Sequence, residues 1–252
     1  MTICDKLDLD LVGIPQTARD VPERYADATV VGPPMGPDVE VLSSLHADCI
    51  LSPNSLVNDL QPKYASVGTR SLFLDMRSVD GMYDSIEVLG SRFDREEQAQ
   101  ALVAEYEDFM ASYRESVAGL ESPRVLILMG VPGSYLVATE NSYAGSLVAQ
   151  AGGVNVYEGT DQEFLNANTE DMLARDPDII LRTAHALPDQ VMSMFADEFA
   201  TNDIWRHFRA VREGRVHDLS YDHFGMSATF NYPDALEDLR PLLYGDRWSA
   251  GA

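Results

Sequence analysis

The chain has 252 residues, 45% of them hydrophobic, and carries 41 acidic against 18 basic residues for a formal net charge of −23. A chain of this length and composition buries a sizeable core, in one large domain or two lobes, so intrinsic disorder is excluded as its main state. Its negative field repels phosphate backbones and anionic headgroups, which argues against a nucleic-acid partner.

The amino-terminal half predicts an α/β lobe. Short runs rich in β-branched residues are separated by segments long enough for a helix or a crossover, and they predict strands at 11–14, 29–31, 49–51 and 71–74. The two cysteines, Cys4 and Cys49, lack the spacing of a zinc site, so two free thiols are favoured over a disulfide.

A long amphipathic helix follows, over residues 94–118, with apolar side chains at helical spacing from Ala99 to Val117. Asp94 is expected to cap its start and Gly119 to end it. No Gly/Ser-rich linker flanks this segment, so it predicts a stiff connection between two lobes.

The strand rhythm then resumes at 125–129, 178–181 and 215–219, and a closing helix is expected over 232–243. The predicted fold is therefore α/β, with an N-terminal lobe over residues 1–93, an interlobe helix over 94–119 and a C-terminal lobe over 120–252. Two Rossmann-like lobes with a ligand cleft between them suit a binding protein or a two-domain enzyme equally well.

The motifs of several enzyme classes are absent. The sequence has no phosphate-binding Gly-Lys-Ser/Thr loop, nucleophile elbow, His-Glu-x-x-His or Cys-x-x-Cys. The segment Met-Gly-Val-Pro-Gly-Ser at 129–134 lacks the third glycine of a dinucleotide turn and contains Pro132. We therefore predict that the chain is not an enzyme.

Two residues are candidates for metal chemistry. Met35 lies among three prolines and two glycines at 32–37, a setting that fixes the backbone, although most loop methionines are merely partly buried. His185 follows the strand predicted at 178–181, where an α/β lobe presents its ligand-binding loops, although a surface histidine is the commoner role. Together a thioether and an imidazole form a known axial pair for haem iron.

Three segments carry a family resemblance: VLILMGVPGSYLVATENS at 125–142, DIILRTAH at 178–185 and NDIWRHF at 202–208. They resemble the haem-receptor lipoproteins of iron-regulated surface determinant systems, and the resemblance extends over nearly the whole chain. These receptors are ABC-transporter substrate-binding proteins of the helical-backbone class, with two Rossmann-like lobes joined by one long helix.

The resemblance implies one haem held between the lobes by a methionine and a histidine, which fall on Met35 in GPPMGPD and His185 in RTAHALPD. It also implies that a glutamate on each lobe docks with the ABC permease; the matching positions are Glu40 and Glu170, for which a carboxylate stabilising a helix start is an equally good interpretation. Pocket-lining groups for the propionates are expected in the matched segments, at Tyr135, Ser142, Tyr143 and Thr183.

Members of this family begin with a lipoprotein signal and a first strand ahead of the segment that matches residues 3–15. The resemblance thus implies an extracytoplasmic, membrane-anchored monomer whose signal and anchor are not among these residues, supplied with haem by an upstream donor protein. Three alternatives are a siderophore, cobalamin or bare-metal receptor of the same fold, in which neither Met35 nor His185 binds haem iron. A tetrapyrrole-processing enzyme is a fourth, and it needs an open iron position or a general acid.

Overall fold

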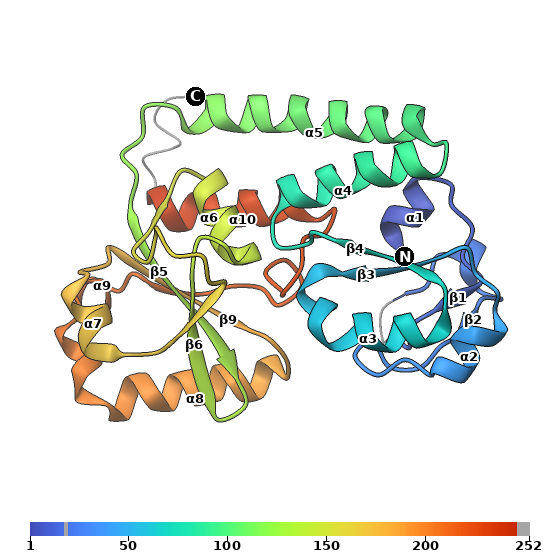
Figure 1. Ribbon diagram of the computed structural model, residues 1–252. Helices are drawn as coiled ribbons and strands as arrows, with labels where there is room; N and C mark the ends of the chain where they lie inside the picture. The colour runs from blue at the N-terminus through green and yellow to red at the C-terminus, as the bar shows by residue number, and fades with distance from the viewer. Residues whose placement is uncertain (18–19, 246–252) are drawn as a thin grey trace. The chain divides into compact units, whose positions relative to one another are not determined.

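The computed structural model describes residues 1–17 and 20–245, and its internal contacts divide the chain into two compact units (Figure 1). Unit 1 comprises Met1–Met76 and Asp80–Glu107, and unit 2 comprises Arg77–Val79 and the chain from Asp108 onward. Both units combine helices with largely parallel strands, so the predicted α/β class is confirmed.

Unit 1 is built on two pairs of parallel strands. The first pair joins β1 (Gly13–Ile14) to β2 (Thr29–Val30), and the second joins β3 (Cys49–Pro53) to β4 (Arg70–Leu74). Each strand coincides with one of the four runs predicted from the sequence. The helical elements of this unit are α1 (Thr2–Lys6), η1 (Glu23–Tyr25), α2 (Val39–Ser44), η2 (Asn54–Leu56), α3 (Val57–Val67) and α4 (Val79–Arg92). Both cysteines are free, with Cys4 buried and Cys49 half-buried.

The long helix α5 spans Glu96–Val117 and contributes residues to both units. Gly119 ends it with a φ of 79°, as predicted. The prediction for Asp94 was wrong: this residue has a φ of 55°, and the Arg95 amide donates to the Gly90 carbonyl at 2.8 Å, which is the bond that closes a Schellman motif. Asp94 therefore ends α4 and does not cap α5.

Unit 2 contains one mixed sheet with the order β10-β9-β5-β6-β8, and β7 also pairs with β5. The strands β5, β7, β9 and β10 run parallel, whereas β6 is antiparallel to both β5 and β8. Their bounds are β5 Arg124–Val131, β6 Ser134–Ala138, β7 Val154–Asn155, β8 Phe164–Asn166, β9 Ile179–Ala184 and β10 Val216–Asp218. The helical elements are α6 Tyr143–Gln150, α7 Thr169–Ala174, α8 Pro188–Thr201, η3 Asp203–His207, α9 Arg209–Arg212 and α10 Tyr232–Tyr244.

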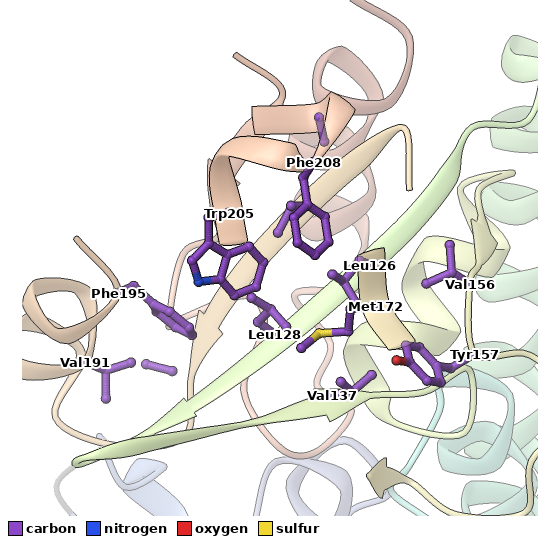
Figure 2. Packing of buried hydrophobic residues seen from close by; sticks show 13 residues of the cluster. Leu126, Leu128, Val137, Val156, Tyr157, Met172, Val191, Phe195, Trp205 and Phe208 are labelled. Carbon is purple, nitrogen blue, oxygen red and sulfur yellow. The ribbon is translucent and has the colours of Figure 1, made fainter. Parts of the chain in front are cut away.

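An aromatic cluster covers one face of this sheet (Figure 2). Trp205 and Phe208 stack with ring centroids 4.8 Å apart, and with Phe195 of α8 they pack in the same buried cluster as Leu126 and Leu128 of β5. All five side chains are fully buried. The burial of so much apolar area fixes α8 and η3 against this sheet.

None of the helices within the described residues is both long enough and apolar enough to cross a membrane.

Gly130 tests how tightly this face is packed. A Cβ atom there would lie 2.2 Å from Val191 Cγ1 and 2.8 Å from Phe195 Cε2, and both of these side chains are fully buried. We expect Gly130→Ala to lower the free energy of unfolding by about 1–3 kcal/mol through overpacking, measured by denaturant titration. The matched control is Gly225→Ala, whose nearest neighbour is 3.8 Å away, and it should change stability by less than about 0.5 kcal/mol. Equal stabilities for the two variants would contradict this packing.

Candidate functional site

Met35 lies in a tight turn of unit 1. The Gly36 amide donates to the Pro33 carbonyl at 3.0 Å, which places Pro34 and Met35 at the two central positions of a β-turn. Proline favours the first of these positions because its ring fixes φ. The Met35 side chain is 65% exposed, so it fills no core.

Further hydrogen bonds fasten both ends of the 31–38 loop. The Asp38 amide donates to the Val31 carbonyl at 2.8 Å, and the Gln16 amide donates to the Gly32 carbonyl at 2.8 Å. Lys63 of α3 adds a third contact, since its Nζ donates to the carbonyl oxygen of Met35 itself at 3.2 Å. The loop thus presents an exposed thioether on a backbone that is held on several sides.

His185 is the first residue after β9 in unit 2. Its amide donates to the Gly130 carbonyl at 2.9 Å and so extends the parallel pairing of β9 with β5 by one bond. The imidazole is exposed. Two residues later Leu187 has a φ of 48°, and α8 begins with Pro188 at its first turn, so the chain turns sharply after presenting His185. The pairing with β5 fixes where the imidazole leaves the sheet.

Two of the predicted pocket residues have hydroxyls that already bond to backbone. Ser142 is the N-cap of α6: its Oγ accepts from the Gly145 amide at 3.1 Å and donates to the Thr139 carbonyl at 2.7 Å. Thr183 Oγ1 donates to the Phe224 carbonyl at 2.8 Å and ties the chain after β10 to β9. Both side chains are buried, and each organises the backbone of unit 2.

The two tyrosines of this set also pack inside unit 2. Tyr143 is buried, its hydroxyl lies beside Thr229 without a hydrogen bond of ordinary geometry, and burial raises its pKa to about 12. Tyr135 packs its ring against Phe195 and Trp205. Packing inside unit 2 therefore explains the positions of both tyrosine rings.

A carboxylate that was not predicted from the sequence to have a role, Glu198, organises the end of α8. One oxygen of Glu198, Oε1, accepts hydrogen bonds from Tyr135 Oη at 3.1 Å, Asn202 Nδ2 at 2.8 Å and Trp205 Nε1 at 3.0 Å. Burial opposes ionisation of this carboxyl, but these donors hold its pKa below the ordinary value. The network joins β6, α8 and η3 beside the buried aromatic cluster, to which Trp205 belongs and against which Tyr135 packs.

The two docking candidates occupy equivalent local positions in their units. Glu40 is the second residue of α2, and Asp38 caps that helix by accepting from the amides of Glu40 and Val41. Glu170 is the second residue of α7, which Asn168 caps in the same way. Both helices have six residues, and both glutamates are exposed.

Within residues 1–17 and 20–245, no group of three or more His, Cys, Asp or Glu side chains is arranged to hold a bare metal ion. Of the four other histidines, His223 pairs with Asp238 at 2.7 Å, and burial lowers the pKa of His217. Neither environment resembles that of His185.

A model of the family described as periplasmic binding protein matches residues 5–222, which is most of the sequence. The chain belongs to the periplasmic binding protein family.

Particular members of the periplasmic binding protein family resemble the chain over nearly all of its length. The high-affinity heme uptake system protein IsdE of Staphylococcus aureus is 42% identical over 248 residues, covering 96% of this chain and 84% of the relative. A crystal structure of S. aureus IsdE complexed with heme superposes with a TM-score of 0.88 at 41% identity, covering 96% of this chain and 94% of that one. An ABC transporter substrate-binding protein from Listeria monocytogenes EGD-e superposes with a TM-score of 0.91 at 46% identity, with the same coverage. The resemblance drawn from the three sequence segments is confirmed.

The Glu198 network gives a pH dependence. Because the folded-state pKa of Glu198 is depressed, its contribution to stability is present above the unfolded pKa, roughly 4.3, and is lost as the pH falls through the lower folded value. We expect Glu198→Gln to melt below wild type at pH 7 and the difference to shrink below about pH 4. Thermal melts across pH, with the exposed Glu213→Gln as control, measure it. A difference independent of pH would show that the charge of Glu198 is not involved.

Proposed function

We propose that the chain is the haem-binding component of an ABC-type haem importer and that Met35 and His185 are the axial ligands of the haem iron. The observation that carries this proposal is the pair of donors: an exposed thioether on a fastened turn in unit 1 and an exposed imidazole at the end of β9 in unit 2. The 42% identity to a heme uptake protein supports haem as the ligand.

The donor set fits haem and suits carriage. A thioether and a neutral imidazole complete the axial coordination of low-spin haem, which leaves no open iron position for oxygen. The chain itself positions the two donors. The pairing of β9 with β5 positions His185, and the turn at Pro33–Gly36 positions Met35. A carrier with both axial positions closed has no catalytic step to perform, in agreement with the transport role of the relatives.

The permease is the partner that the two glutamates would contact. Exposed carboxylates on two short, Asx-capped helices can form charge-assisted pairs with arginines, and such pairs orient a complex as well as stabilise it. Capping by Asp38 and Asn168 fixes the backbone of the first turn, from which each glutamate side chain projects.

The proposed location is outside the cytoplasmic membrane, where the protein is anchored as a lipoprotein and acts as a monomer. The net charge of −23 bears on how haem arrives, because haem carries two anionic propionates and long-range repulsion slows its capture from solution. Handover by direct contact with a donor protein avoids much of that barrier, so we propose an upstream haem donor as a second partner.

The axial assignment is tested by titrating the purified protein with haemin and recording the visible spectrum. We expect saturation at one haemin per chain with a low-spin spectrum, and an altered spectrum with weaker binding in both Met35→Ala and His185→Ala. The control variants are Met226→Ala and His207→Ala, which remove a methionine and a histidine outside the proposed ligand pair. Saturable haemin binding that is unaltered in both ligand variants would contradict the axial assignment. The absence of saturable haemin binding would favour a siderophore or cobalamin receptor.

The docking assignment is tested with the importer reconstituted in vesicles. Glu40→Gln and Glu170→Gln should each reduce haem uptake severalfold and the double variant should abolish it, because each removes one charge-assisted pair. Haemin affinity should stay unchanged in all three. The control is Glu158→Gln, an exposed glutamate outside both helices. Uptake at wild-type rates in the double variant would rule out these two contacts.

A further inference from the structure

The contact between Lys63 and Met35 links a charged side chain to the proposed iron ligand. Lys63 lies on α3, in a segment 28 residues away from Met35 in the sequence, and its ammonium reaches the carbonyl oxygen of that residue. The bond therefore acts on the second central residue of the turn, the one whose side chain would hold iron. No bond of the turn itself reaches this carbonyl, because the turn bond runs from Gly36 to Pro33.

The choice of residue is unusual for this composition. The sequence contains two lysines, Lys6 and Lys63, against 41 acidic residues. Within the part of the chain that the structure describes, Lys63 Nζ is paired with the Met35 carbonyl and with no carboxylate. A lysine in so acidic a chain has many carboxylates as possible partners. Its hydrogen bond to a backbone carbonyl at this turn therefore indicates a specific role.

We propose that Lys63 is a positioning residue for the Met35 ligand: it holds the peptide that carries the thioether and thereby keeps the sulfur in place for iron. The proposal rests on the proposed function. A methionine side chain has three rotatable bonds and is intrinsically adaptable, so the orientation of its sulfur depends on a fixed Cα position. Hydrogen bonds from two backbone amides hold the ends of the loop, and the hydrogen bond from Lys63 holds the central turn.

The test compares Lys63→Met, Lys63→Arg and Lys6→Met. Methionine keeps the length and helix propensity of lysine but cannot donate, arginine restores a charged donor, and Lys6→Met removes the chain's other lysine charge. The first readout needs no haem: amide hydrogen exchange at Gly36, which reports opening of the turn. We expect Lys63→Met to speed this exchange about fivefold, the factor for a hydrogen bond of ordinary net strength, with Lys63→Arg and Lys6→Met close to wild type.

The second readout uses the ferric haem complex. Loss of methionine ligation lowers the reduction potential of haem iron, so Lys63→Met should have a lower potential and a reduced methionine-ligated fraction in its spectrum, and Lys63→Arg should restore both. Faster exchange with an unchanged potential and spectrum would mean that Lys63 stabilises the loop without positioning the ligand, which overturns the proposal. Exchange equal to that of Lys6→Met also overturns it.

A wild-type protein that fails to bind haemin would instead refute the proposed function, and the exchange measurement would still decide whether Lys63 holds the turn. The two failures are therefore distinguishable.

Discussion

The parallel pairing of β5 with β9 is the constraint on which the organisation of unit 2 depends. Six residue pairs join these strands, from Val125–Ile179 to Gly130–Ala184, and the His185 amide adds one more bond to the Gly130 carbonyl. Both strands are almost wholly buried, so their hydrogen bonds are shielded from competition with water. This ladder fixes the residue at which the chain leaves the sheet, and that residue is the proposed histidine ligand.

The two units present their donors by different physical means. In unit 2 the position of His185 follows from a buried sheet with an aromatic cluster packed on it, so the imidazole is placed by a large cooperative structure. In unit 1 the loop around Met35 depends on a few surface hydrogen bonds and on prolines that restrict its backbone. The position of Met35 is therefore expected to be more sensitive to single substitutions than the position of His185. The loop around Met35 has few hydrogen bonds, so the loss of any one of them loosens the loop more.

The strands and the long helix could be predicted because their apolar patterns are local and regular. Residues 125–129 are continuously apolar and lie in the buried middle of β5, and the helical spacing from Ala99 to Val117 predicted the extent of α5 closely. Asp94 was misassigned because aspartate favours both helix caps and the left-handed conformation, and the bond that decides between them ends α4, a helix that was not predicted from the sequence. Met35 and His185 were identified from their sequence neighbours, whereas Lys63 was not, since its partner Met35 lies 28 residues away. The donors Asn202 and Trp205 lie 4 and 7 residues from Glu198, but the third donor, Tyr135, lies 63 residues away, and the sequence pattern does not bring the three together.

An exposed thioether and an exposed imidazole are ordinary surface groups when each is considered alone. Their proposed role depends on one haem engaging both, and identification of the two iron ligands tests this most directly. The measurement is a crystal structure of the protein loaded with haemin at one equivalent. The account predicts iron bonded to the sulfur of Met35 and to a ring nitrogen of His185. Iron bonded to any other side chain, or with one axial position open to water, would contradict it.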